Sequence, residues 1–134
     1  MQFSHILLLA ALAGPVATPA LAGAQTLDIT IANTGSETLR CRAATAHWFS
    51  VDMGDVGPGE SLSYSFGVDV QTGGVFQLND RGDHMAVQRI WCGEKGNDWP
   101  SRAEIRMERR AGVEPQAVRL NCASDKGKTA CVAP

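Results

Sequence analysis

Short segments in which apolar and polar residues alternate recur along almost the whole of this chain, with turn-forming residues between them. Alternation is typical of a β-strand with one buried face, because successive side chains point to opposite sides of a sheet. Clear examples are residues 27–32, 38–46, 60–66 and 116–122. Strands of this length, with turn signals about every 8–12 residues, predict an all-β fold, namely a small antiparallel β-sandwich.

Three segments between these strands need separate interpretations. Residues 47–51 are expected to form a further strand, and the glycine- and proline-rich residues 54–59 are expected to form a loop. Residues 101–109 leave two structures open. Their strict alternation, with Ala103, Ile105 and Met107 on one side, favours a strand. Their arginine, glutamate, methionine and alanine content would also suit a helix.

The stretch from residue 27 to residue 66 has a broad resemblance to bacterial immunoglobulin-like domains. It contains a strand that ends in Asn33, a turn with glycine, and a Pro-Gly-Glu-Ser turn at residues 58–61 that opens another strand. The resemblance covers about a third of the chain and implies a sandwich that is immunoglobulin-like in broad shape. It does not include the cysteine and tryptophan spacing of true immunoglobulin domains, and it implies no ligand or activity.

The N-terminus has the pattern of a secretory signal peptide. An uncharged apolar run at residues 6–13 is broken by Gly14-Pro15 and followed by the small-x-small triplet Ala20-Leu21-Ala22. Signal peptidase recognises this arrangement, so residues 1–22 are predicted to be removed. Cleavage there would leave residues 23–134 as a single β-sandwich domain, secreted or periplasmic. A second triplet at residues 22–24 offers an alternative cut.

A membrane anchor is the competing interpretation of the same segment. Residues 6–24 carry no charge and approach the length of a membrane-spanning helix, and no lysine or arginine precedes them. Gly14, Pro15 and Pro19 would interrupt such a helix, which favours cleavage. We therefore expect no stable membrane span once the leader has been cleaved.

Four cysteines, Cys41, Cys92, Cys122 and Cys131, are predicted to form two disulfides, since an even number in an exported chain is typical of bridges. Three pairings are possible. If Lys126-Gly127 is a two-residue turn, Cys122 faces Cys131 at a non-hydrogen-bonded position, where a disulfide fits. A three-residue loop would shift the register and spoil this pairing. Cys41 with Cys92 follows by elimination.

The tryptophans are the main candidates for binding. Trp99 lies in a polar loop at residues 93–100, where an exposed indole would suit contact with a protein, an envelope component or a carbohydrate. Trp48 and its neighbour His47 begin a second candidate contact segment at residues 47–59. The alternative for Trp48 and Trp91 is core packing beside the Cys41–Cys92 bridge.

Metal binding and catalysis have weaker support. His47 and His84 are the only histidines after the leader, and they are weak candidates for a metal site or an enzyme active site. Their spacing matches no usual ligand set. None of the common hydrolase or nucleotide-binding motifs occurs, so no catalytic residue and no cofactor is predicted.

The formal net charge of −2 gives no reason to expect nucleic acid as a partner. The sequence favours a non-catalytic binding or interaction module. A small secreted metal-binding protein or enzyme that uses His47 and His84 is one alternative. A structural accessory domain of an envelope assembly, with an open sheet edge or a large apolar patch, is another.

Overall fold

The computed structural model describes residues 24–134, and the predicted signal peptide lies outside the described residues. Within residues 24–134 no helix is long and apolar enough to cross a membrane. The described chain is all-β, as predicted. Its strands are β1 (Ala24–Asn33), β2 (Leu39–Thr45), β3 (Ser50–Val56), β4 (Ser61–Asp69), β5 (Gly74–Leu78), β6 (His84–Glu94), β7 (Ala103–Ile105), β8 (Val118–Asp125) and β9 (Lys128–Val132).

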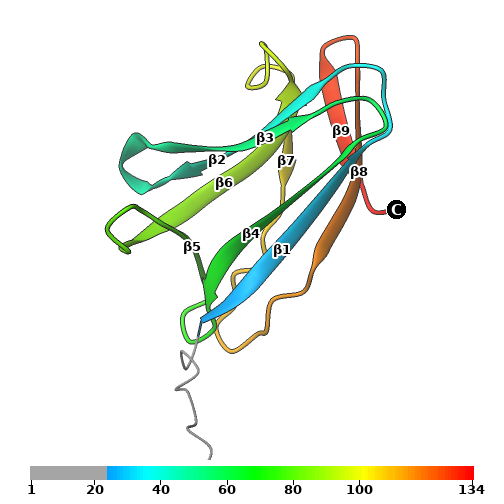
Figure 1. Ribbon diagram of the computed structural model, residues 1–134. Coiled ribbons are helices and arrows are strands. Elements are labelled where there is room, and N and C mark those ends of the chain that lie inside the picture. Colours follow the sequence, from blue (N-terminus) through cyan, green and yellow to red (C-terminus); the bar gives the residue numbers. More distant parts are fainter. Residues whose placement is uncertain (1–23) are drawn as a thin grey trace, which may run out of the picture.

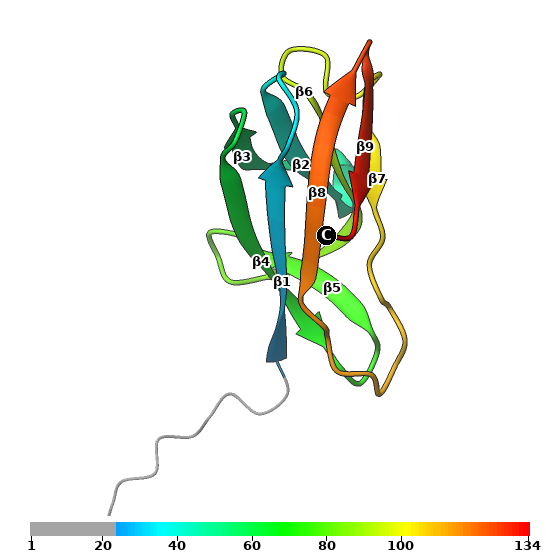
Figure 2. The ribbon, with the colours of Figure 1, turned by 90° about the vertical axis from the view of Figure 1, so that its right-hand side faces the viewer.

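The nine strands form one continuous hydrogen-bonded sheet in the order β3-β2-β6-β5-β4-β1-β8-β9, with β7 paired to β6 off this path. The sheet folds over, so that β4, β1, β8 and β9 lie in front of β3, β2 and β6 in Figure 2. The two layers enclose a single core, and Figure 1 shows them from the side. This arrangement is consistent with the expected sandwich, although β5 connects the two layers into one sheet.

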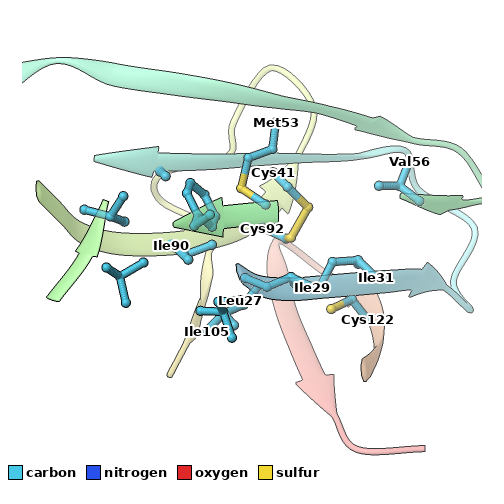
Figure 3. Packing of buried hydrophobic residues seen from close by; sticks show 14 of the residues in the cluster. Leu27, Ile29, Ile31, Cys41, Met53, Val56, Ile90, Cys92, Ile105 and Cys122 are labelled. Carbon is cyan, nitrogen blue, oxygen red and sulfur yellow. A yellow bond between two sulfur atoms is a disulfide. The ribbon is translucent and has the colours of Figure 1, made fainter. Parts of the chain in front are cut away.

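Alternation along the strands determines which side chains enter the core. In β2 every second residue is buried, beginning with Leu39, and Cys41 and Ala43 follow on the same face. In β1 the buried positions are Leu27, Ile29 and Ile31. Figure 3 shows Ile29 and Ile31 on the strand that faces the Cys41–Cys92 bridge, and both bridged cysteines are completely buried. The predicted inward faces of both strands are confirmed.

Both disulfides have the predicted pairing. Cys122 faces Cys131 across β8 and β9, and Asp125 faces Lys128 at the turn. Lys126 and Gly127 both have positive φ, as a two-residue hairpin turn of this type requires. Cys41 faces Cys92 across β2 and β6. The Cα atoms of each bridged pair are 4.1 Å apart. Two structural disulfides indicate an oxidising, non-cytoplasmic environment.

One strand pair departs from the antiparallel prediction. β1 and β8 run parallel, with Ile29 beside Val118 and Ile31 beside Leu120, and both arrows point the same way in Figure 2. Parallel neighbours need a long connection between them. Here the irregular segment at residues 106–117 carries the chain back to the start of β8.

The strand predicted at residues 47–51 and the loop predicted at residues 54–59 are both displaced. Residues 46–48 form a short 3₁₀ turn, and β3 then continues through Gly54 to Val56. β3 contains a β-bulge, because Cys41 pairs with Gly54 while Arg42 pairs with Asp52. The extra residue puts Met53 and Val56, three positions apart, on the buried side.

Residues 101–109 form neither a long strand nor a helix. Only Ala103–Ile105 pairs with β6, where Ile105 faces Ile90. Pairing with β7 ends at Ile90, two residues from Gln88, which a second bulge leaves without a partner in β2. The backbone carbonyl of Gln88 instead accepts a hydrogen bond of 2.7 Å from the guanidinium of Arg109. Tertiary pairing therefore shortened a strand that local alternation had favoured.

Candidate functional site

The three side chains predicted as contact residues, His47, Trp48 and Trp99, line one open groove of about 610 Å³. The groove covers the outer side of β2 and β6, since Ala44 and Arg89 pair there and their chain neighbours Ala43 and Ile90 are buried. The complete lining also includes Thr45, Phe49, Ser50 and Gln88. We call it the Trp48 groove. Three local irregularities of the fold converge on it.

The first irregularity is the turn that carries Trp48. His47 and Trp48 both adopt left-handed backbone conformations, with φ of 66° and 68°. Residues other than glycine rarely do so, and a bulky residue pays a steric cost there. Trp48 is nevertheless completely exposed, and Phe49 is 62% exposed. Trp48 therefore does not belong to the core, and its indole is presented to solvent.

The base of this turn is closed by Thr45. Its backbone N–H donates to the carbonyl oxygen of Phe49 at 2.8 Å, and its hydroxyl donates to the same oxygen at 3.2 Å. Thr45 itself is buried. The disulfide at Cys41 lies four residues further down the same strand. These bonds hold the turn in place while its two central residues remain strained.

The second irregularity is the loop at residues 95–102, which folds back over β6. Trp91 is buried beneath this loop, and its indole N–H donates to Asp98 at 3.0 Å. A Cβ at Gly93 would collide with the backbone of Asp98, so only glycine permits this close approach. Arg42 Nε lies 3.6 Å from the same carboxylate. Trp91 is thus buried, as core packing would require, but it lies under the loop and outside the main core cluster.

Trp99 is held on top of this loop by aromatic and cationic neighbours. Its ring packs edge-on against Trp91 with the centroids 5.2 Å apart. The guanidinium of Arg102 lies 3.7 Å from the Trp99 centroid and that of Arg89 lies 5.8 Å from it. Cation–π contact of this kind favours a fixed ring orientation. Trp99 remains 45% exposed and forms one wall of the groove.

The third irregularity is the bulge in β6. Ala44 pairs with Arg89 whereas Thr45 pairs with Val87, so Gln88 is the extra residue. Both Gln88 and Arg89 are exposed and line the groove, although alternation would have put them on opposite faces. Bulges commonly redirect side chains beside functional sites. The sequence shows a signal for it, because two polar residues separate the buried Val87 and Ile90.

The lining of the Trp48 groove contains no carboxylate, although the whole chain has a net charge of −2. Its ionisable groups are His47 and Arg89. The nearest acid to Arg89 is Glu104, with 3.5 Å between guanidinium nitrogen and carboxylate oxygen, and both side chains are about half exposed. A loose, solvated pair of this kind contributes little energy. Arg89 is therefore available to a ligand.

An ion-pair cluster ties the 95–102 loop to the edge of the sheet. Asp55 in β3 accepts hydrogen bonds from Arg40 at 2.7 Å and lies 2.8 Å from the ammonium group of Lys95. Bonding to Arg40, and then to Lys95, lowers the pKa of Asp55 below its usual range. The backbone N–H of Lys95 also donates to Thr38 at 2.9 Å. This cluster positions the loop that carries Trp99.

The two histidines lie in different surroundings. His84 stacks on Phe76 with ring centroids 3.7 Å apart, in a groove beside β4 and β5, whereas His47 lines the Trp48 groove. No group of three or more His, Cys, Asp or Glu side chains within residues 24–134 is arranged to hold a metal ion. The cysteines that could have joined them are bridged.

A second groove of about 540 Å³ lies on the other side of Phe49 and has a different character. Its apolar lining includes Val51, Leu78 and Met85, and Leu78 is 51% exposed. It shares Thr45, Phe49 and Ser50 with the Trp48 groove. Residues that line only this second groove, such as Leu78, can therefore be substituted as controls, because they lie close to the Trp48 groove but outside its lining.

Comparison with known proteins assigns this chain to no family. No protein-family model matches the chain, and no curated protein matches it significantly. The function must therefore be argued from the residues of the site.

Proposed function

We propose that this protein is an exported, non-catalytic binding module that captures its ligand in the Trp48 groove. The observation that carries the proposal is the completely exposed Trp48, held on two consecutive left-handed residues that are not glycine. Strain of this kind persists where the surrounding structure enforces it, and it is concentrated at functional sites. Two further irregularities, the Gln88 bulge and the folded-back loop, bring the rest of the lining to the same place.

The composition of the groove supports binding. Aromatic side chains and arginine supply most of the energy in protein binding sites, and three aromatics and one arginine lie here together. A preformed wall also reduces the entropy lost on association. His47 has no carboxylate beside it in the lining, so the groove offers no acid–base pair for catalysis.

Assembly through the β3 edge of the sheet has less support. β3 ends the strand order, but it carries a bulge and the acidic residues Asp52 and Asp55. Bulges and charges at an edge discourage the addition of another strand. The proposed contact surface is therefore the groove on the sheet face.

The export part of the proposal is tested by the intact mass of the protein recovered from outside the cytoplasm. We expect a chain that begins at Gly23, with four thiols that react only after reduction. A retained leader would contradict export in cleaved form. Thiols that react without reduction would contradict the oxidised state.

The binding part is tested with a panel of purified probes: acidic and neutral oligosaccharides, phospholipid vesicles and unfolded polypeptide. We expect the wild-type protein to bind at least one of them. Trp48→Ala should abolish that binding, while Leu78→Ala, in the neighbouring groove, should retain it. Binding that survives Trp48→Ala, or a panel with no binding at all, would refute the Trp48 groove as the site.

A further inference from the structure

We propose that the ligand of the Trp48 groove is a saccharide that carries a carboxylate. The inference rests on the proposed binding function and adds the chemical class of the ligand. Three properties of the lining support it: a free aromatic face, a rim of neutral hydrogen-bonding groups, and a cationic end without competing acids in the lining.

The aromatic face is that of Trp48. Its complete exposure leaves the ring free to contact a ligand, whereas Trp99 is already partly covered by Arg102. The face of an indole carries negative charge density, and the C–H groups on one side of a pyranose ring are weakly positive. A flat sugar ring would therefore bury its apolar side against Trp48. Because the closed base at Thr45 holds the turn, little freedom is lost.

The rim supplies groups that match sugar hydroxyls. Gln88 has one acceptor oxygen and two donor hydrogens, and the hydroxyl of Ser50 both donates and accepts. The bulge is what brings Gln88 to the same groove as Arg89. A purely apolar ligand, such as a lipid chain, would leave these polar groups without partners when they are desolvated, which costs free energy.

The cationic end is Arg89, and it favours an acidic sugar over a neutral one. A guanidinium binds a carboxylate through two parallel hydrogen bonds, and such charge-assisted bonds are stronger than those between neutral groups. Arg89 is about half exposed and only loosely paired with Glu104 at 3.5 Å. His47 is the other ionisable group of the lining, so no acid in the groove repels a ligand carboxylate.

Glu104 then acts as a competitor for Arg89, and this gives the sharpest test. A ligand carboxylate must replace Glu104 beside the guanidinium. Glu104→Gln removes the competing charge and should tighten the binding of an acidic saccharide. Arg89→Gln should weaken the same binding about tenfold, because a charged hydrogen bond is lost. Glu104→Gln should leave the binding of a neutral saccharide unchanged, because Glu104 lies outside the lining of the Trp48 groove.

The experiment uses the mature protein with both disulfides and titrates it with paired probes. Tetramers of galacturonic, glucuronic and mannuronic acid are compared with tetramers of galactose, glucose and mannose, and affinity is followed by calorimetry and tryptophan fluorescence. At least one acidic tetramer should bind about ten times more tightly than its neutral counterpart. Trp48→Ala should abolish binding of both members of that pair.

Other outcomes would overturn the inference in distinguishable ways. Equal binding of acidic and neutral tetramers would refute the acidic class and leave the proposed binding function intact. So would Trp48-dependent binding of vesicles or of polypeptide without binding of any saccharide. No binding of any probe would refute both the inference and the proposed function. A fold measurement by circular dichroism on each variant ensures that lost binding does not reflect unfolding.

Discussion

Two hairpins of this protein each carry a disulfide with the same Cα separation, yet they differ in regularity. Cys122–Cys131 joins the two strands of the β8–β9 hairpin, whereas Cys41–Cys92 joins β2 of the β2–β3 hairpin to the neighbouring strand β6. The β8–β9 hairpin pairs without interruption from Cys122–Cys131 to its two-residue turn. The β2–β3 hairpin has a bulge beside Cys41, and its turn puts His47 and Trp48 in left-handed conformations. β6, which pairs with β2 on the side away from β3, carries a second bulge.

The β8–β9 hairpin has the features of a scaffold, whereas the β2–β3 hairpin has those of the proposed site. In the β8–β9 hairpin the register and the disulfide agree with local preference, as is usual where a segment only has to be stable, and Lys126 is its single left-handed residue other than glycine. The β2–β3 hairpin departs from local preference at its bulge and at its left-handed turn, and β6 beside it has a second bulge. The turn adds His47 and Trp48 to the lining of the Trp48 groove, and the β6 bulge adds Gln88. Backbone strain is found more often at functional sites than in scaffolds, so its convergence on one surface supports the proposed binding site.

The largest expected effect concerns the two bridges. Replacing Cys41 and Cys92 by alanine should lower the free energy of unfolding by about 4 kcal/mol, because the loop closed by this bridge is long. The same change at Cys122 and Cys131 should cost about 2.7 kcal/mol, since those residues are only nine apart. Urea denaturation followed by tryptophan fluorescence measures both. An equal or reversed order would contradict loop closure as the cause.

The loop that carries Trp99 should be the next most sensitive feature. Gly93→Ala introduces a Cβ into the backbone of Asp98 and should cost about 2 kcal/mol, typical of overpacking. Gly74→Ala is the matched control, because its nearest neighbour is the flexible hydroxyl of Thr72 at 3.2 Å. Thermal unfolding compares the two. A tolerated Gly93→Ala would mean that the loop does not need this close approach.

Relief of backbone strain should have a smaller effect on stability, and it should distinguish the turn of the β2–β3 hairpin from that of the β8–β9 hairpin by its effect on binding. His47→Gly and Lys126→Gly each remove a left-handed residue other than glycine and should raise stability by about 0.5 kcal/mol. Only His47→Gly should weaken ligand binding, because Lys126 lies in the regular hairpin. Denaturation midpoints and affinities measured on both variants test this. A loss of binding in Lys126→Gly would contradict the proposal that only the turn of the β2–β3 hairpin contributes to ligand binding.

A comparably small effect, and one that depends on pH, is expected at Asp55. Arg40 and Lys95 lower its pKa in the folded state, so its contribution to stability is complete above the unfolded pKa of about 4 and declines as the pH falls below that value. Asp55→Asn should cost about 0.5 kcal/mol at pH 7, since the carboxylate is partly exposed. The difference from wild type should shrink between about pH 4 and pH 2. A difference that is constant with pH would exclude the ion pairs as its source.

Local sequence rules succeeded where neighbouring residues alone decide the structure. The register of the β8–β9 hairpin followed from the Lys126-Gly127 turn, because a two-residue loop specifies every facing pair. The buried faces of β1 and β2 followed from alternation. The same rules failed at residues 101–109, where the length of β7 depends on how much of the edge of β6 is free.

The candidate site was only partly visible in the sequence. His47, Trp48 and Trp99 were named from their types and their loop positions, and one groove does unite them. Gln88 and Arg89 were missed, since a simple alternation puts them on opposite faces. The three-residue spacing of Val87 and Ile90, repeated at Met53 and Val56, is the pattern that reveals a bulge in each neighbour of β2.

By itself, then, the sequence determined the strand character of this chain and the pairing of its cysteines, and it named three side chains that line one groove. These properties depend on side-chain periodicity and on short loops, which act over a few residues. The tertiary structure alone decided the folded single sheet, the parallel β1–β8 pair and the convergence of three irregular segments on one groove. Those depend on contacts between residues tens of positions apart, whose geometry no local pattern encodes.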